Sequence, residues 1–400
     1  MDSALQKLLP ARSHHTQLIG RPFQIAGYIE RKTTSYIVEL LDPDTGESFA
    51  AKILLPKDPL LGNATTRATR HANLRECALR NPKFAPDGVC VGLRPIIRLD
   101  GETLYCGRVT PPDALDRRFE YAWFMHLLPQ GESITDKIQR NSAILQPLAE
   151  AVHEVHARAD KLNEQEAWRF AGHERLAAKL QMNLAWFERA LGVILPNLSA
   201  QERQRLWPEG CMRQLGQIME AVLHDDLYRR AFDARIVAGA IRKGHGDIKA
   251  KNIWFSDYYR TEMVRSFKDC LVLIDAIDFE DSFSTIDTLS EAAMLTVDLQ
   301  LRLSPGDYAQ FLHYYIRGMP QWRLTEELVF AYYLLEKAIA ITWVAALLDE
   351  DQQAALAALW QVRLYLQALL DQVQRTLRFS AEHQPGDRSR DGAESHMARR

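Results

Sequence analysis

The chain has 400 residues, of which 47% are hydrophobic and 25% are charged, so it can bury a large core and divide into two domains. Its formal net charge of −3 argues against a general electrostatic affinity for nucleic acid. The 5 cysteines are scattered without metal-ligand or redox spacing, so we interpret them as reduced thiols of a cytoplasmic protein. We find no signal-peptide pattern and no apolar run of the roughly 18 residues that span a bilayer, so we expect no membrane association.

The first third of the chain is predicted to be mainly β. Short runs rich in β-branched and aromatic residues alternate with turn residues, which is typical of antiparallel strands joined by tight turns. The expected strands are residues 24–30, 36–41, 48–55, 91–98, 104–106 and 120–128. A helix is expected at residues 64–80, because this stretch is rich in Ala, Arg, Glu and Leu and has neither Pro nor Gly.

Beyond the Pro and Gly at residues 129–131, the chain is predicted to be almost wholly helical. The expected helices are residues 143–158, 164–191, at least two within 199–241, 285–303, 307–317, 325–348 and 351–379. Strand character returns only at residues 253–255 and 271–275. The resulting domains are a lead-in over 1–20, a β-rich N-lobe over 21–130, a helical C-lobe over 131–380 and a tail over 381–400. The tail has almost no apolar residues and is predicted to be disordered.

The strongest chemical signal is the loop His-Gly-Asp-Ile-Lys-Ala-Lys-Asn at residues 245–252. Asp247 and Asn252 lie five residues apart in it, and the strand expected at residues 271–275 ends in Asp275. A kinase uses this arrangement for phosphoryl transfer. Asp247 is then the residue that orients the attacking hydroxyl, and Asn252 and Asp275 are the ligands of Mg²⁺. The neighbouring Asp278 is an alternative ligand.

Lys249 and His245 complete the predicted loop. Lys249 follows Asp247 by two residues and can meet the γ-phosphate as charge develops. The alternative is a surface lysine, since Lys251 lies beside it. His245 is expected to anchor the loop through a backbone hydrogen bond.

Lys52 and Glu76 are the candidates for the nucleotide site in the β-rich part. Strand alternation puts Lys52 on the same side as Ala50 and Leu54, so we expect it to point inward and bind the α- and β-phosphates. Glu76 is the acid of the helix at residues 64–80 and is the expected partner of Lys52. The alternative for Glu76 is an ion pair with Arg80, one helical turn away.

These residues resemble the aminoglycoside phosphotransferase-like branch of the protein-kinase-like superfamily, in particular a bacterial subgroup of it. The resemblance rests on His-Gly-Asp-x-x-x-x-Asn at residues 245–252 and Ile-Asp at residues 274–275, and it extends over roughly residues 20–350. It implies an α+β, bilobal protein-kinase-like fold, with a small antiparallel β N-lobe carrying one main helix and a large, mostly helical C-lobe. It also implies ATP and Mg²⁺ as cofactors, and a hinge in which the backbone groups of Met125, His126 and Leu127 hold adenine.

The leading prediction is an ATP-dependent kinase that moves the γ-phosphate to a hydroxyl of a small molecule. Two alternatives stay open. A peptide or protein kinase is favoured by Lys249, because antibiotic kinases of the family usually carry His at that place. A non-catalytic, nucleotide-binding pseudokinase is favoured by the turn at residues 31–35, which lacks the glycines that let backbone N–H groups approach phosphate. Neither the acceptor nor the oligomeric state follows from the sequence.

Overall fold

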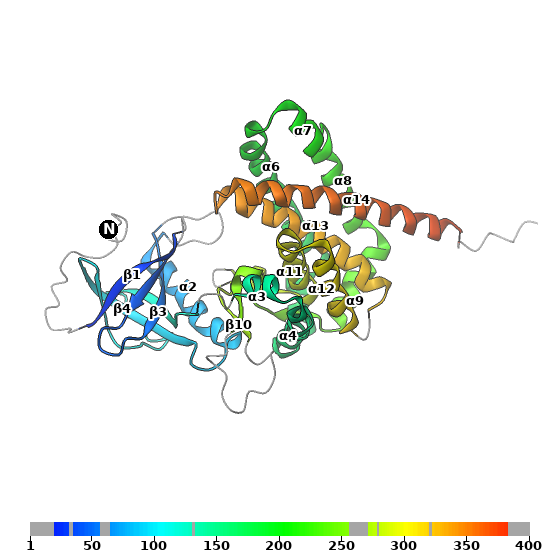
Figure 1. Ribbon diagram of the computed structural model, residues 1–400. Helices are drawn as coiled ribbons and strands as arrows, with labels where there is room; N and C mark the ends of the chain where they lie inside the picture. The colour runs from blue at the N-terminus through cyan, green and yellow to red at the C-terminus, as the bar shows by residue number, and fades with distance from the viewer. Residues whose placement is uncertain are drawn as a thin grey trace, which may run out of the picture.

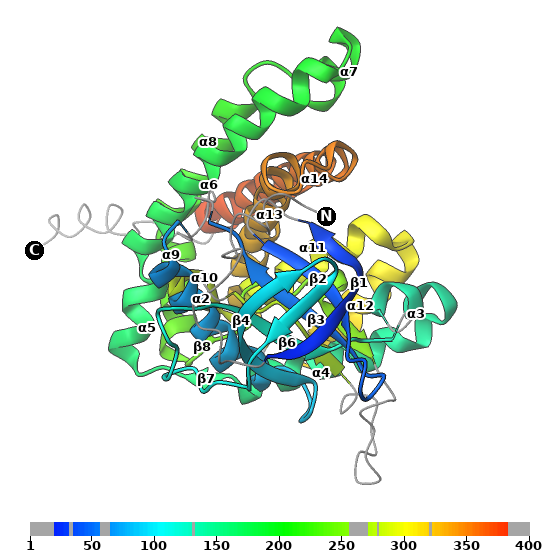
Figure 2. The ribbon, with the colours of Figure 1, turned by 90° about the vertical axis from the view of Figure 1, so that its left-hand side faces the viewer.

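A computed structural model combines an antiparallel β part with a larger helical part (Figure 1). It describes residues 20–31, 35–56, 65–129, 133–255, 271–277, 280–319 and 322–382. The strands formed by residues 21–126 and helix α2 (Arg67–Arg80) gather at one end of the molecule, and Figure 2 views this end with the helices behind it. The mixture of helices and antiparallel strands that the sequence predicts is therefore present.

Six antiparallel strands close into a barrel in the order β1-β2-β3-β6-β4-β5. Their bounds are Arg21–Arg31 (β1), Ser35–Leu41 (β2), Ser48–Leu54 (β3), Cys90–Asp100 (β4), Thr103–Cys106 (β5) and Glu120–His126 (β6). Alternate side chains fill the interior, among them Phe23, Val38, Phe49 and Phe124. All six predicted strands occur, with ends shifted by a few residues. The largest extension is at the start of β1, where Arg21 pairs with Cys106 of β5 and closes the barrel.

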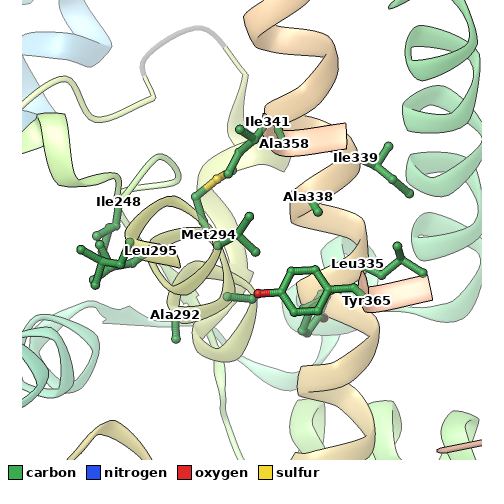
Figure 3. Close-up of a cluster of buried hydrophobic side chains, with 14 of the residues drawn as sticks. Ile248, Ala292, Met294, Leu295, Leu335, Ala338, Ile339, Ile341, Ala358 and Tyr365 are labelled. Carbon is green, nitrogen blue, oxygen red and sulfur yellow. The ribbon is translucent and has the colours of Figure 1, made fainter. Parts of the chain in front are cut away.

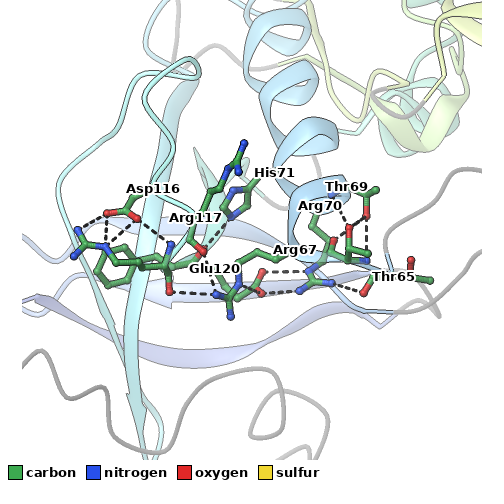
Figure 4. Close-up of polar contacts among 11 residues, drawn as sticks. Thr65, Arg67, Thr69, Arg70, His71, Asp116, Arg117 and Glu120 are labelled. Atoms are coloured by element: carbon green, nitrogen blue, oxygen red, sulfur yellow. Dashed lines mark hydrogen bonds and ion pairs between the residues drawn. The ribbon is translucent and has the colours of Figure 1, made fainter.

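Helix α2 (Arg67–Arg80) packs on the barrel and is fixed there by an ion-pair cluster. The helix begins after Thr66, whose side chain accepts a hydrogen bond from the backbone N–H of Thr69. Arg70 donates to both carboxylate oxygens of Glu120 on β6, at 3.1 and 2.6 Å, and Arg67 adds a bond at 2.8 Å (Figure 4). Two guanidinium groups on one buried carboxylate make this contact directional as well as strong. The position of α2 on the barrel is therefore set by charge as well as by apolar packing.

The helical part is built around α13 (Leu324–Leu347), which is buried along most of its length. The other helices are α3 (Ile134–Arg140), α4 (Leu145–Arg158), α5 (Glu164–Ala171), α6 (His173–Ile194), α7 (Ala200–Leu206), α8 (Cys211–His224), α9 (Asp226–Val237), α10 (Asp281–Ser284), α11 (Thr288–Arg302), α12 (Pro305–Arg317) and α14 (Gln352–Glu382). Figure 3 shows the core where α11, α13 and α14 meet. By length and composition α13 could cross a membrane, but 83% of its most apolar window is buried inside the protein.

Short strands join the helices near the loop at residues 245–252. Strands β7 (Asp160–Lys161), β8 (Ile241–Lys243) and β11 (Thr285–Asp287) form one small sheet, and β9 (Ile253–Phe255) and β10 (Leu271–Leu273) form another. The loop therefore connects two sheets, leaving β8 and entering β9.

Two helix predictions are wrong in their boundaries, those for residues 164–191 and 285–303. The helix expected at residues 164–191 is two helices, because the chain turns at Gly172, where a Cβ atom would lie 2.5 Å from the carbonyl oxygen of Trp168. The prediction of at least two helices within residues 199–241 is confirmed, since this range holds α7, α8 and α9. Residues 285–287 pair with β8 as strand β11 before α11 begins, because hydrogen bonds to β8 outweigh the local helical pattern.

Several predictions concern the ends of segments. Helix α14 continues to Glu382, past the expected start of the tail at residue 381. Five predicted features lie outside the described residues. They are the lead-in at residues 1–19, most of the turn at 31–35, residues 130–132 at the expected lobe boundary, Asp278, and the tail from 383 onward. The domain boundaries therefore stay predictions.

Candidate active site

His245 anchors the loop at residues 245–252 in the way that the sequence predicts. Its side chain is fully buried, and its Nε2 lies 2.9 Å from the carbonyl oxygen of Ile274. Burial lowers the pKa of His245 despite the nearby carboxylates, so the neutral imidazole is favoured. A single neutral tautomer satisfies both ring nitrogens, because Nε2–H donates to Ile274 while Nδ1 accepts from the N–H of Asp247 at 3.3 Å. The imidazole thereby ties the loop to the segment that carries Asp275.

Gly246 gives the loop its sharp entry. Its φ is +88°, and a Cβ atom at this position would lie 2.8 Å from the carbonyl oxygen of Phe283. Only glycine adopts this conformation without strain and tolerates this approach. Two residues later, Ile248 turns inward and joins the hydrophobic core, where Figure 3 shows it beside Leu295 of α11. The loop is therefore fixed by packing as well as by hydrogen bonds.

Two buried acids of α11 hold the loop backbone, and the sequence reasoning did not identify this role. Glu291 accepts a hydrogen bond from the N–H of Gly246, and Asp298 accepts one from the N–H of Ala250 at 2.7 Å. The two acids are seven residues apart, about two helical turns, so they share one face of α11. The sequence signal for this role was the spacing of Glu291 and Asp298, two acids on one face of an otherwise apolar helix.

Glu291 also lies 3.2 Å from the Nε2 atom of His156 on α4. Burial alone would raise the pKa of Glu291. The hydrogen bond and charge of His156, with His245 and the N–H of Gly246, outweigh burial and hold the pKa below its ordinary value. We therefore expect Glu291 to be an ionised, buried anchor of the loop at neutral pH.

Asp247 is held from two sides. The ammonium of Lys249 lies 2.7 Å from its Oδ1 atom, and the amide nitrogen of Asn252 donates to its backbone carbonyl at 3.0 Å and to its Oδ2 at 3.3 Å. Lys249 is only 13% exposed, so it is not the surface lysine that the sequence left as an alternative. Burial lowers the pKa of Lys249, but the charge and hydrogen bond of Asp247 outweigh burial and raise it above its ordinary value. Lys249 is therefore positively charged at neutral pH.

Asp275 meets Lys52 across 223 residues of sequence. The ammonium of Lys52 on β3 lies 2.9 Å from the Oδ1 atom of Asp275, and both side chains are partly buried. Asp275 has a φ of +61°, a left-handed conformation that costs a non-glycine residue about 1–2 kcal/mol. Such a conformation persists where surrounding contacts impose it, and it occurs often at functional sites.

Backbone hydrogen bonds impose this conformation on the segment around Asp275. The N–H groups before and after it are all bonded, from Ile274 to the carbonyl of Asn252, from Ala276 to the side chain of Asn81, and from Ile277 to the carbonyl of His245. Two of these acceptors belong to the loop at residues 245–252. Asp247, Asn252 and Asp275, predicted from separate stretches of sequence, are therefore on two adjoining segments.

Glu76 does not occupy its predicted place. Its carboxylate is 44% exposed and lies 3.4 Å from the Nε atom of Arg80, which is the alternative that the sequence offered. Among the residues that the structure describes, Asp275 has a carboxylate that meets Lys52. The reason is helical phase, because the buried face of α2 carries Arg70, Leu74 and Cys77, whereas Glu76 is partly exposed and lies one turn before Arg80.

Arg80 itself contacts α10, where it donates to Asp281 and to the hydroxyl of Ser284. The end of α2 therefore presents a cation, and not the expected acid, to the helical part.

The predicted hinge has its amide groups engaged within the protein. Met125 and His126 belong to β6, and Leu127 follows it. The N–H of His126 donates to the carbonyl of Val89 at 2.9 Å, and the N–H of Leu127 donates to the carbonyl of Ser48 at 3.0 Å. These two N–H groups are therefore not available as donors to an adenine ring, and the expectation that this segment holds adenine stays a prediction for its carbonyl groups.

The oxygen atoms that could bind a cation are those of Asn252 and Asp275. The amide nitrogen of Asn252 is used by Asp247, so its carboxamide oxygen is the atom left for a metal. Within the described ranges, no group of three or more His, Cys, Asp and Glu side chains converges on one point. Mg²⁺ in kinase sites is held by one or two such oxygens together with phosphate and water. Asn252 and Asp275 fit that kind of ion.

Comparison with known proteins gives similar structures only. No family model and no curated protein matches the chain. Among solved structures, it is similar to Plasmodium vivax ethanolamine kinase, with 12% identity, a TM-score of 0.43, and coverage of 86% of this chain and 81% of that one. It is also similar to a GDP complex of aminoglycoside 2'-phosphotransferase-IIIa, with 11% identity, a TM-score of 0.43, and coverage of 89% of this chain and 95% of that one. A third similar structure is macrolide 2'-phosphotransferase MphH from Brachybacterium faecium, with 13% identity, a TM-score of 0.31, and coverage of 83% of this chain and 90% of that one. Because these TM-scores lie below 0.5, the function is inferred below from the side chains of this chain.

Proposed function

We propose that the protein is an ATP-dependent phosphotransferase with a bilobal, protein-kinase-like fold, which moves the γ-phosphate to a hydroxyl of a small molecule. The barrel and α2 would be the small lobe, and the helical part the large one. The observation that carries the proposal is the ion pair of 2.9 Å between Lys52 and Asp275. It joins a cation of the barrel to the segment that adjoins Asp247 and Asn252, which is the arrangement that phosphoryl transfer needs.

Asp247 is the proposed group that orients the acceptor. Its carboxylate would accept a hydrogen bond from the acceptor hydroxyl and receive its proton as the oxygen bonds to the γ-phosphorus. The bond between that phosphorus and the bridging oxygen of ADP breaks in the same step. Lys249, already 2.7 Å from Asp247, would keep the carboxylate in place and lie near the negative charge that develops on the phosphoryl group.

Asn252 and Asp275 are the proposed ligands of Mg²⁺, which when bound would neutralise charge on the phosphates. Lys52 would bind the α- and β-phosphates from the β3 side. The adenine ring would donate a hydrogen bond to a backbone carbonyl oxygen near the end of β6. The N–H groups of His126 and Leu127 already donate to other backbone carbonyls of the protein.

A small-molecule acceptor is favoured over a peptide by the chain after Asp275. Helix α10 begins at Asp281 and β11 at Thr285, so only a short connection separates Asp275 from the next regular elements. A peptide-docking segment of the kind found in protein kinases would need a longer stretch there. The buried Lys249 is compatible with either acceptor and does not decide between them.

The variant Asp247→Asn tests the proposal. We expect phosphoryl transfer to fall by about 10²- to 10⁴-fold, because the amide cannot accept the proton. Thermal shift with Mg-ATP should show that nucleotide still binds. The acceptor is first found by measuring ATP consumption over a panel of hydroxylated metabolites, and the exposed substitution Asp113→Asn serves as the matched control. Transfer by Asp247→Asn at the rate of this control would refute the assigned role.

A further inference from the structure

The C-terminal end of α2 contacts the segment that carries Asp275, and Figure 1 shows it beside β10. Phe84, which follows the short 3₁₀ helix Asn81–Lys83, accepts a hydrogen bond from the N–H of Leu273 at 2.9 Å. Its ring packs edge-on against the imidazole of His245, with 5.2 Å between the ring centres. The end of α2 therefore supports both segments of the candidate site.

Asn81 stands at this end of α2, and its carboxamide has a single orientation. The residue is 4% exposed. Its Nδ2 atom donates to the carbonyl of Cys77 at 3.0 Å and lies 3.2 Å from the Sγ atom, while Oδ1 accepts from the N–H of Ala276 at 3.1 Å. Exchanging the two atoms would set a donor against a donor and an acceptor against an acceptor. The carboxamide therefore presents its oxygen to Ala276.

The backbone of Asn81 is also held in place. Pro82 follows it, and the residue before a proline usually avoids the helical region. Asn81 nevertheless has φ −55° and ψ −38°, and both its backbone N–H and its Nδ2 donate to the carbonyl of Cys77. The position of the carboxamide oxygen is therefore set by α2.

The hydrogen bond from Ala276 to Asn81 acts on the backbone of Asp275. The N–H of Ala276 belongs to the peptide unit that follows Asp275, so holding it fixes ψ of Asp275, whose φ is +61°. Ala276 is 1% exposed, and without Asn81 its N–H would lose the acceptor that the structure gives it. A buried, unpaired N–H would favour another peptide orientation by about 5- to 150-fold. Release of the left-handed conformation would favour it by a further factor of about 5 to 30.

We propose that Asn81 is a positioning residue of the active site. Its carboxamide oxygen holds the N–H of Ala276 and so keeps Asp275 in the conformation in which its carboxylate meets Lys52. Because the start of α2 is bonded to Glu120 on β6, Asn81 also links the barrel to the segment of Asp275. The consequence for Mg²⁺ binding rests on the proposed function, whereas the consequence for the backbone does not.

The alternative is that Asn81 only ends α2, through its bonds to Cys77. Two variants separate these roles. Asn81→Leu has a similar branched shape and removes both kinds of hydrogen bond, whereas Asn81→Asp loses the donor to Cys77 but keeps an oxygen that can accept from Ala276. The matched control is Asn183→Leu on α6, because Asn183 is 3% exposed and its carboxamide also donates one hydrogen bond and accepts another.

The first measurement needs no ligand. Hydrogen exchange followed by NMR reports how readily the N–H of Ala276 opens in the folded protein. We expect Asn81→Leu to speed this exchange by about tenfold or more, and Asn81→Asp to stay within about threefold of the wild type. Asn183→Leu should leave the exchange of Ala276 unchanged. Unchanged exchange in Asn81→Leu, or equal acceleration in Asn81→Leu and Asn81→Asp, would overturn the inference.

The second measurement tests the metal site without turnover. Mn²⁺ takes the place of Mg²⁺, and electron paramagnetic resonance gives its affinity in the presence of a non-hydrolysable ATP analogue. We expect Asn81→Leu to weaken Mn²⁺ binding by about 10- to 100-fold, as for loss of a group that orients a metal ligand. Binding of the analogue without metal should change by less than about threefold, because Lys52 lies on β3. Asn183→Leu should change neither. Asn81→Asp is left out of this measurement, because its carboxylate would itself attract a cation.

The two measurements separate this inference from the proposed function. If the wild type binds neither the analogue nor Mn²⁺, the proposed function fails, and the exchange of Ala276 decides the role of Asn81. If the wild type binds both and Asn81→Leu binds Mn²⁺ equally tightly, the positioning role fails and the proposed function stands. Urea unfolding checks that each variant folds, and Asn81→Ala replaces Asn81→Leu in both measurements if the larger side chain prevents folding.

Discussion

Replacing Glu291 by Gln tests whether a buried charge positions the catalytic loop. The carboxylate accepts a hydrogen bond from the N–H of Gly246 and faces His156 at 3.2 Å. A hydrogen bond to a charged group contributes about 1.5–3 kcal/mol, and a neutral one about 0.5–1.5 kcal/mol. Removing the charge from the bond to Gly246 and from the contact with His156 would cost about 2 kcal/mol together, and the smaller desolvation cost of the neutral amide returns part of this. We therefore expect Glu291→Gln to lower the free energy of unfolding by about 1–2 kcal/mol at pH 7.

The pH dependence has a definite sign. The pKa of Glu291 is lower in the folded protein than in the unfolded chain, where a Glu titrates near 4.3. Its contribution to stability is therefore present above about pH 4.3 and is lost as the pH falls through the folded pKa. Gln does not titrate, so the stability difference between the wild type and Glu291→Gln should shrink in acid.

Urea unfolding followed by tryptophan fluorescence at pH 7 and at about pH 4 measures both effects. Glu220→Gln, an exposed substitution on α8, is the matched control. The rate of phosphoryl transfer should fall by about tenfold while the KM for Mg-ATP is unchanged, because Gly246 precedes Asp247 and not a nucleotide-binding residue. Equal midpoints for the two variants at pH 7, or a difference that grows in acid, would refute the reasoning.

Two further substitutions follow from the site. Gly246→Ala should destabilise the protein by more than about 1–2 kcal/mol, since φ is +88° and the new Cβ would clash with Phe283, whereas Gly192→Ala, with open space around it, should not. Thermal unfolding measures both, and equal melting temperatures would contradict the prediction. Lys52→Met should weaken Mg-ATP binding by about tenfold or more, because it removes the ion pair with Asp275 and the cation proposed for the phosphates. Calorimetry checks this, and an unchanged dissociation constant would remove Lys52 from the site.

The local elements of the fold could be predicted from the sequence, because they follow from neighbouring residues. Alternating apolar residues predicted the barrel strands, and composition predicted a helix at residues 64–80, which the structure places at 67–80. The prediction failed at residues 285–287, which form a strand although their local pattern is helical. There the deciding hydrogen bonds come from β8, more than 40 residues earlier in the chain, and no local pattern contains them.

In the candidate site too, the sequence identified the reactive residues but not their partners. The spacing of Asp247 and Asn252 and the strand-end position of Asp275 are sequence features, and they identified three residues that the fold brings onto adjoining segments.

The partners of these residues were decided only by tertiary structure. The helical phase of α2 turned Glu76 toward Arg80, so the carboxylate that meets Lys52 is Asp275. The packing of α11 under the loop gave Glu291 its role as an anchor of Gly246. Side-chain chemistry is a property of single residues and can be recognised in a sequence. Which residue becomes its partner depends on how helices and strands that are hundreds of residues apart in the sequence pack together, so it is decided only in the tertiary structure.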